Sequence, residues 1–264
     1  MLKNHVEQER PGEEELGRRL EEARKRLGAL QMQIKEHGLP VLVLMEGWGT
    51  AGKGSTIGKI IRNIDPRFFK VATMAAPTEE ELRKPFLYRY FARIPEAGKF
   101  TFLDSGWMDE ITGDVLQGKL DDKGYASRID SVKRFERQLT DNGYLVMKFF
   151  FHIDEKEQRK RLDALLVNKD TSWRVSESDR WQNKHYDKCL KVFDRYLDDT
   201  NVSTAPWYIV DAHSRKWAQL QVLEMLCQGI DVALQNKSLA VPLLQNTFPL
   251  EKMPKLGEIA LDKT

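Results

Sequence analysis

The sequence has little cysteine and no long hydrophobic run, and both features narrow the class of protein. Its 264 residues include only Cys189 and Cys227, too few for a disulfide scaffold and too far apart for a paired metal-ligand motif. This cysteine usage predicts a reducing, cytoplasmic location. No apolar segment approaches the ~18 residues of a membrane helix, and residues 1–12 lack the apolar centre of a signal peptide.

The sequence also has no large excess of positive or negative residues. Lys and Arg total 42 against 40 Asp and Glu, which leaves a net charge of +2. This charge creates no overall field that would attract nucleic acid or a membrane, so we expect neither as a partner. Any anion site must therefore be local. The five histidines form no spaced cluster and predict no metal site.

Apolar runs that fit buried strands alternate with segments of helical spacing. The clearest run, residues 41–45, is continuously apolar and is followed by Gly47. Similar runs occupy residues 70–75, 100–103, 144–153 and 207–210. Continuous apolar strands separated by helices are typical of a parallel sheet covered on both faces. The sequence therefore predicts an α/β fold with three layers, α/β/α.

The chain divides into three parts by composition and period. Residues 13–37 carry one apolar stripe in steps of three and four, so residues 1–38 are predicted to form an N-terminal helical extension. Residues 39–236 form the main domain. The charged segment at about 155–200 is expected to be inserted in it as a helical lid that stands off the sheet. Residues 237–264 contain Pro242, Pro249 and Pro254 without a period and predict a linker-like tail.

A glycine-rich segment with a lysine follows the best predicted strand. It reads Gly47-Trp48-Gly49-Thr50-Ala51-Gly52-Lys53 and precedes a segment of helical pattern. Backbone N–H groups of such a turn, with the positive end of the next helix, form a cradle for phosphate oxygens, and the lysine adds a charge. The predicted phosphate-binding residues are Gly47, Gly49, Thr50, Ala51, Gly52, Lys53, Gly54 and Ser55. Gly54 stands where phosphate loops usually have Ser or Thr for Mg²⁺.

The same segment also fits two other interpretations. It also fits the dinucleotide pattern G-x-G-x-x-G, but that pattern expects an acidic residue after the second strand, and residues 71–76 contain none. Alternatively, the glycines only allow close packing of strand and helix, with Lys53 solvated. The lysine and the position between strand and helix favour phosphate binding.

Two further residues are candidates for phosphate chemistry. Asp104 ends the predicted strand 100–103 at the sheet edge where the phosphate loop must lie, so it could hold Mg²⁺, although an aspartate there is often only a cap or turn residue. Arg174 lies at the break in the predicted lid, from which it could bring a cation to the reacting phosphate. The other basic residues of the lid have acidic neighbours, which predicts an ordinary solvated face. They are Lys156, Arg159, Lys160, Arg161, Lys169, Arg180, Lys184 and Lys188.

From about Leu27 to Leu226 the sequence resembles the family-2 polyphosphate kinases, and among them the polyphosphate:AMP phosphotransferases. The matching segments are Met45–Gly54, Asp65-Pro66-Arg67, Ala76–Glu81, Tyr88-Arg89-Tyr90, Phe135-Glu136, Glu157-Gln158-Arg159, Trp173-Arg174-Val175 and Ala205-Pro206-Trp207. The resemblance implies a P-loop NTPase-like fold with a helical lid and Mg²⁺-dependent phosphoryl transfer between inorganic polyphosphate and an adenine nucleotide. It implies catalytic roles for Lys53, Asp104 and Arg174. We add Lys59 and Arg67 to the predicted phosphate-binding residues.

Two departures from the family pattern leave three hypotheses open. Gly49 stands where the loop usually has Asp, and Ser105 stands where the second motif usually has Arg. The first hypothesis is an enzyme that moves a phosphoryl group between polyphosphate and AMP or ADP. The second is a catalytically impaired half that binds polyphosphate or nucleotide and serves assembly or regulation. The third is a nucleotide monophosphate kinase that uses ATP. Residues 256–264 resemble the linker of tandem members, so we expect a homo-oligomer or pairing with a second similar domain.

Overall fold

A parallel sheet forms the centre of the molecule. The computed structural model describes residues 1–5 and 9–247, and of Asn4 and residues 237–247 only the backbone. The strands are β1 (Val41–Gly47), β2 (Phe69–Thr73), β3 (Phe100–Asp104), β4 (Leu145–His152) and β5 (Trp207–Asp211). They pair in the order β2-β3-β1-β4-β5, and every pair is parallel. The predicted α/β class with a parallel sheet is confirmed.

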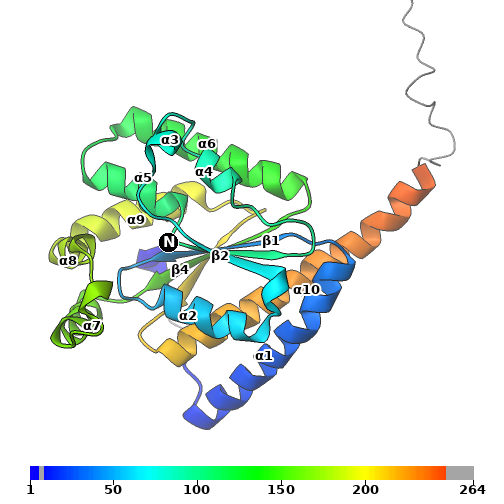
Figure 1. The fold of residues 1–264 in the computed structure, drawn as a ribbon, viewed down its shortest axis with the longest axis horizontal. Coiled ribbons are helices and arrows are strands. Elements are labelled where there is room, and N and C mark those ends of the chain that lie inside the picture. The colour runs from blue at the N-terminus through cyan, green and yellow to red at the C-terminus, as the bar shows by residue number, and fades with distance from the viewer. Residues whose placement is uncertain (6–8, 248–264) are drawn as a thin grey trace, which may run out of the picture.

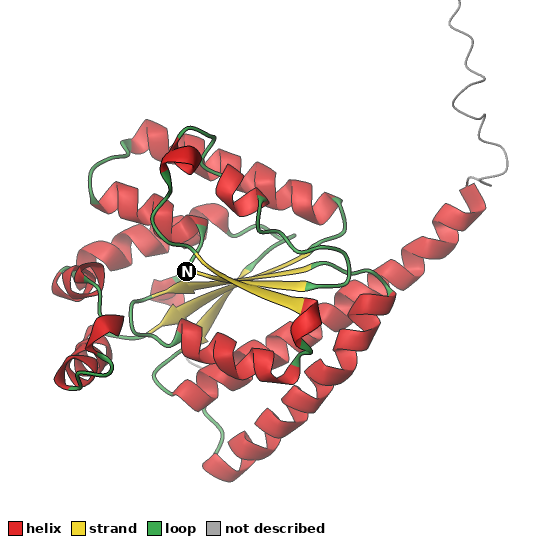
Figure 2. Ribbon diagram, in the orientation of Figure 1, coloured by secondary structure: helices red, strands yellow, loops and turns green. Residues whose placement is uncertain are grey.

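Helices cover both faces of this sheet (Figures 1 and 2). One layer contains α1 (Glu13–Glu36), α2 (Lys53–Ile60) and α10 (Arg215–Thr247). The opposite layer contains α5 (Trp107–Leu116), α6 (Asp122–Asp141) and α9 (Tyr186–Thr200). Residues 41–46 of β1 are all buried, because the strand lies in the centre of the sheet between the two layers. The continuous apolar run in the sequence has this physical origin.

Shorter elements connect these layers. They are the 3₁₀ turns η1 (Leu2–Asn4), η2 (Ile61–Asn63), η3 (Pro66–Phe68) and η4 (Ser172–Arg174), and the helices α3 (Glu79–Leu82), α4 (Tyr88–Phe91), α7 (Glu155–Val167) and α8 (Glu177–Lys184). Among the described residues, no helix is both long and apolar enough to cross a bilayer. Cys189 and Cys227 are both buried and unpaired with each other.

The N-terminal helix packs on the same chain. Its stripe of Leu16, Leu20, Leu27, Leu30 and Ile34 is buried, and α1 lies along α10 (Figure 1). Ion pairs flank the contact, since Arg19 meets Glu224 and Arg26 meets Asp231. The stripe is therefore satisfied within one chain.

Two expectations about the helices are wrong. The segment 155–200 is not wholly a hairpin that stands off the sheet: α7 and α8 project from the body, whereas α9 buries Phe193, Tyr196 and Leu197 against the core. The apolar positions of α9 recur at helical spacing, and the surrounding charges obscured that stripe. In addition, residues 237–247, which were predicted to begin a linker-like tail, continue the helix α10 to Thr247. The tail residues 248–264, including the linker-like 256–264, lie outside the described residues.

Candidate functional site

The predicted phosphate loop and Asp104 meet at the carboxyl edge of the sheet. The loop follows β1, Asp104 ends the neighbouring strand β3, and Met45 pairs in register with Asp104. The chain leaves β1 towards one side of the sheet and crosses after β3 to β4 on the other side. In open parallel sheets, ligands bind outside the carboxyl ends of the strands at such a switch point. The fold therefore places both predicted features where a ligand is expected.

Two glycines shape the loop for close backbone approach. Gly47 has φ of 120°, and a Cβ atom there would lie 2.4 Å from the carbonyl oxygen of Phe151. Gly52 has φ of 102° and precedes α2 as its N-cap. Between them, Thr50 adopts φ of 62°, a left-handed conformation that is uncommon for a β-branched residue. The loop thus leads the chain from a buried strand directly into the N-terminus of a helix.

Lys53 and Asp104 face each other across this loop. The Lys53 Nζ donates hydrogen bonds to the carbonyl oxygens of Gly47 (3.0 Å) and Trp48 (3.1 Å). Burial raises the pKa of Asp104, and the Lys53 charge partly opposes that rise. Within the described residues, the Asp104 carboxylate accepts no hydrogen bond. The lysine and the aspartate are therefore both available to a ligand at the loop.

The residues at this edge fit a divalent cation. A Cβ atom at Gly54 would lie 2.9 Å from the Asp104 Oδ2, so glycine leaves the space that the carboxylate occupies. In the part of the chain that the structure describes, no group of three His, Cys, Asp or Glu side chains forms a complete metal site. Mg²⁺ in phosphoryl-transfer sites usually takes one or two carboxylates, with water and substrate phosphates as its other ligands. Asp104 meets that requirement.

Two acidic residues near the loop, Asp109 and Glu46, are not among the predicted site residues. Asp109 of α5 lies in the wall of a cleft. The surrounding protein desolvates its carboxylate, and this raises the pKa of Asp109. The charges of Asp179 and Asp104 raise it further. Glu46 is fully buried, which raises its pKa to about 8. Its Oε1 accepts hydrogen bonds from the backbone of Gly106 and Met108, so Glu46 caps the start of α5. Glu46 therefore supports the site from within the core.

The lid contacts the phosphate loop through amide side chains. The Gly49 N–H donates to the Gln182 Oε1 of α8 at 2.8 Å. Gln158 of α7 donates to the same Gln182 oxygen at 2.7 Å and to the Gly49 carbonyl at 3.3 Å. Asn183 in turn donates to the Gln158 Oε1 at 3.1 Å. No spacing rule in the sequence identifies these residues, because their partners are backbone groups that only the folded lid brings near.

Arg161 corrects the prediction that the basic residues of the lid are solvated. Its side chain is only 8% exposed. The guanidinium donates to the carbonyl oxygens of Thr50, Ala51, Ala212 and His213 at 2.7–3.3 Å. Glu157 lies 2.8 Å away on the same helix face and balances its charge. Arg161 therefore fastens α7 to both the phosphate loop and the turn after β5.

The other predicted site residues are not gathered at the loop in the same way. Arg174 is exposed at the end of η4, where its guanidinium lies over the ring of Trp173. Lys59 lies in the last turn of α2, about 9 Å along the helix axis from Lys53. Arg67 is 81% exposed and pairs with Asp65, which lowers the pKa of Asp65 to about 2. Ser55 is exposed on the first turn of α2. The loop geometry lends no support to phosphate binding by Lys59 or Arg67.

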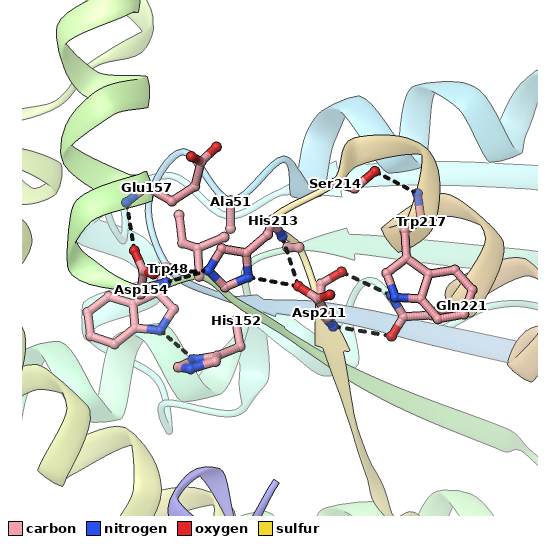
Figure 3. Close-up of polar contacts among 12 residues, drawn as sticks. Trp48, Ala51, His152, Asp154, Glu157, Asp211, His213, Ser214, Trp217 and Gln221 are labelled. Atoms are coloured by element: carbon pink, nitrogen blue, oxygen red, sulfur yellow. Dashed lines mark hydrogen bonds and ion pairs between the residues drawn. The ribbon is translucent and has the colours of Figure 1, made fainter. Parts of the chain in front are cut away.

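A network of aromatic and polar side chains supports the loop from behind (Figure 3). The Trp48 ring stacks on Tyr186 at 3.9 Å, and its Nε1 donates to the His152 Nδ1 at 3.1 Å. The Asp154 carboxylate caps α7 and lies 3.4 Å from His213, which also contacts Asp211. The network connects β4, α7 and the turn after β5 to the base of the loop.

This network predicts a loss of stability in acid. Burial lowers the pKa of His152 to about 4, whereas an unfolded histidine has a pKa of ~6.5. The unfolded chain therefore binds the proton first, so the free energy of unfolding falls as the pH drops from 6.5 towards 4, by at most about 3 kcal/mol from this residue. We expect His152→Gln to flatten this part of a stability profile measured by denaturant unfolding at each pH. An unchanged profile would contradict the assignment.

A cavity of about 320 Å³ opens beside the loop, between α5 and the lid. Its wall includes Asp109, Thr112 and Gly113 on α5, and Trp181 and Gln182 on α8. Gln182 is also the residue that contacts Gly49. The volume lies at the lower end of the range for small-molecule pockets. A ligand in this cavity would therefore adjoin the phosphate loop.

These features together define a P-loop protein of the three-layer α/β type with a helical lid. The sequence profile of the polyphosphate kinase 2 (PPK2) family matches residues 11–238, and the chain belongs to this family. A polyphosphate:AMP phosphotransferase of Pseudomonas aeruginosa is 32% identical over 220 residues, which cover 83% of this chain and 44% of that protein. The chain spans less than half the length of the polyphosphate:AMP phosphotransferases that it matches.

Solved structures of the same family share the fold. Polyphosphate kinase 2 from Arthrobacter aurescens superposes with a TM-score of 0.77 at 26% identity, over 80% of this chain and 77% of that one. A putative polyphosphate kinase 2 from Pseudomonas aeruginosa superposes with a TM-score of 0.83 at 25% identity, over 89% of this chain and 50% of that one. The predicted family and fold are confirmed.

Proposed function

We propose that this chain transfers a phosphoryl group between inorganic polyphosphate and an adenine nucleotide, AMP or ADP, with Mg²⁺. The observation that carries the proposal is the juxtaposition of the loop, Lys53 and Asp104 at one sheet edge in a chain of the PPK2 family. The names of its relatives, which include AMP and ADP phosphotransferases, support the same chemistry.

Each residue has a role in this proposal. The loop amides and Lys53 hold the phosphates of the donor, and Asp104 holds Mg²⁺, which neutralises charge on the phosphoryl group when bound. The acceptor nucleoside occupies the cavity between α5 and α8, beside the ring of Trp181. Arg174 is the cation that the lid brings to the phosphates. A phosphate oxygen of the acceptor forms the new bond to phosphorus, and the shortened polyphosphate leaves with the electron pair.

The surroundings of the enzyme are also proposed. The two buried, unbridged cysteines support a cytoplasmic location. Because the chain spans less than half of several relatives, we propose that it works as a homo-oligomer or beside a second similar domain. The even balance of charge supports neither nucleic acid nor membrane as a partner.

Product analysis with the purified chain tests the function. With polyphosphate, Mg²⁺ and AMP we expect ADP, measured by chromatography, and no product once EDTA has removed the metal. ATP replaces polyphosphate in a parallel reaction, and faster transfer from ATP would favour a nucleotide monophosphate kinase. Absence of product together with measurable polyphosphate binding would contradict the enzyme and favour a binding half.

A further inference from the structure

The lid helix α8 lies directly on the phosphate loop at Gly49. Gln182 accepts the Gly49 N–H at 2.8 Å. Asp179, three residues earlier and on the same face of α8, points its Oδ1 at the Gly49 Cα. A Cβ atom built on Gly49 would lie 2.0 Å from this oxygen and 2.9 Å from the Asp179 Cγ. No side chain can therefore stand at position 49 while Asp179 keeps its place.

The orientation of Asp179 is set by its own helix. Its Oδ2 accepts hydrogen bonds from the backbone N–H (2.9 Å) and the hydroxyl (2.7 Å) of Ser176, and the Ser176 hydroxyl accepts the Asp179 N–H in return. This capping box uses one carboxylate oxygen. The other oxygen, Oδ1, accepts no hydrogen bond from the described residues and faces the loop. The lid thus presents a fixed, uncommitted carboxylate oxygen to the phosphate site.

Asp179 lies close enough to Asp109 for their charges to interact, and Asp109 is also influenced by Asp104. Asp104 and Asp109 both feel the Lys53 charge. Arg161, the other cation bound to the loop, is already paired with Glu157. Three carboxylates and one unpaired ammonium leave an excess of negative charge where a phosphate chain must bind. A divalent cation removes this excess and is attracted by the same carboxylates.

We propose that Asp179 is a metal-facing carboxylate of the site, contributed by the lid, and that residue 49 is glycine because this carboxylate occupies the space of its side chain. This inference rests on the proposed function in one respect: the substrate phosphates of that function would be further ligands of the same cation. It assigns the cation one ligand from the sheet edge, Asp104, and one from the lid, Asp179. Closure of α8 on the loop and binding of the cation then favour each other.

Mn²⁺ binding tests the proposal without relying on turnover. Mn²⁺ is titrated into the full chain, alone and with tripolyphosphate, and the free ion is measured by electron paramagnetic resonance. Asp179→Asn keeps an oxygen for the Ser176 capping bonds but removes the charge, and we expect its Mn²⁺ affinity to fall about tenfold or more, since affinity follows the charge of the ligands. Asp187→Asn, an exposed aspartate at the start of α9, is the matched control and should bind as the parent does.

An exchange of the two positions provides the second test. Gly49→Asp alone should clash with Asp179 and weaken Mn²⁺ binding. Gly49→Asp combined with Asp179→Gly returns one carboxylate to the same space from the loop, and we expect affinity within about threefold of the parent. Thermal unfolding confirms that each variant is folded.

The possible results separate the two proposals. Equal Mn²⁺ affinity for the parent and a folded Asp179→Asn, or no gain from the exchange over Gly49→Asp, would overturn the role of Asp179. Failure of the parent to bind Mn²⁺ under either condition would overturn it as well. If Mn²⁺ alone follows the expected pattern but tripolyphosphate binds to no protein, the proposed function fails while the carboxylate assignment stands.

Discussion

Replacing Lys53 by alanine is expected to lower the rate of phosphoryl transfer by about 10²–10³-fold, the usual cost of removing one preorganised electrostatic group. Lys53 is the first residue of α2, so its charge adds to the positive end of the helix at the place where phosphate binds. In the structure its ammonium is held by the Gly47 and Trp48 carbonyls, from which a phosphate can recruit it. Phosphoryl transfer depends on such positioned charge more than on covalent chemistry.

The same reaction separates a specific loss from a general loss of positive charge. Rates are compared under single-turnover conditions with polyphosphate and AMP. Arg62→Ala removes a cation from the exposed turn η2 that follows α2, and we expect it to retain the parental rate. Among the described residues, the hydrogen bonds of the Lys53 ammonium go to two loop carbonyls, so we expect Lys53→Ala to unfold near the parental temperature. Equal losses of rate in both variants would contradict the assignment of Lys53.

The sheet and the loop could be predicted because local patterns encode them. A strand buried on both faces requires a continuous apolar run, and β1 shows one in residues 41–45. The glycines of the loop are required by backbone geometry, as at Gly47, where any Cβ would strike the chain at Phe151. Asp104 could be placed because parallel strands end at one edge, so a residue after β3 must lie near a loop after β1.

The contacts between lid and loop could not be predicted, because they depend on how a helix of charged residues folds back. In the sequence, Arg161 has acidic neighbours, as a solvated arginine on a helix surface usually has. In the structure its guanidinium donates to four backbone carbonyls of distant segments. Gln158 and Gln182 are uncharged and belong to no charge or spacing pattern in the sequence. They contact the loop only because the lid folds back on it. Gly49 appeared in the sequence as a lost carboxylate, whereas the structure shows a carboxylate from α8 against it.

A second large effect is expected in the core, where β4 contains a lysine among apolar residues. Lys148 and Glu136 of α6 are both fully buried, and the Lys148 Nζ donates to the Glu136 Oε2 at 2.7 Å and to the Thr200 carbonyl at 2.9 Å. Burial lowers the pKa of Lys148 and raises that of Glu136, and each charge opposes the shift of the other. Neither charge is stable there alone.

Glu136→Leu is therefore expected to lower the free energy of unfolding by about 3–5 kcal/mol, because it leaves a buried ammonium without its partner. Removing both charges in Glu136→Leu with Lys148→Met should recover most of this loss, since apolar side chains of similar volume bury without a desolvation penalty. In the double variant the Thr200 carbonyl loses its hydrogen-bond donor. We therefore expect the double variant to remain about 1 kcal/mol less stable than the parent. Guanidinium unfolding of the parent, both single variants and the double variant measures the coupling between the two residues. A double variant no more stable than Glu136→Leu would show that the pair contributes through packing and not through charge.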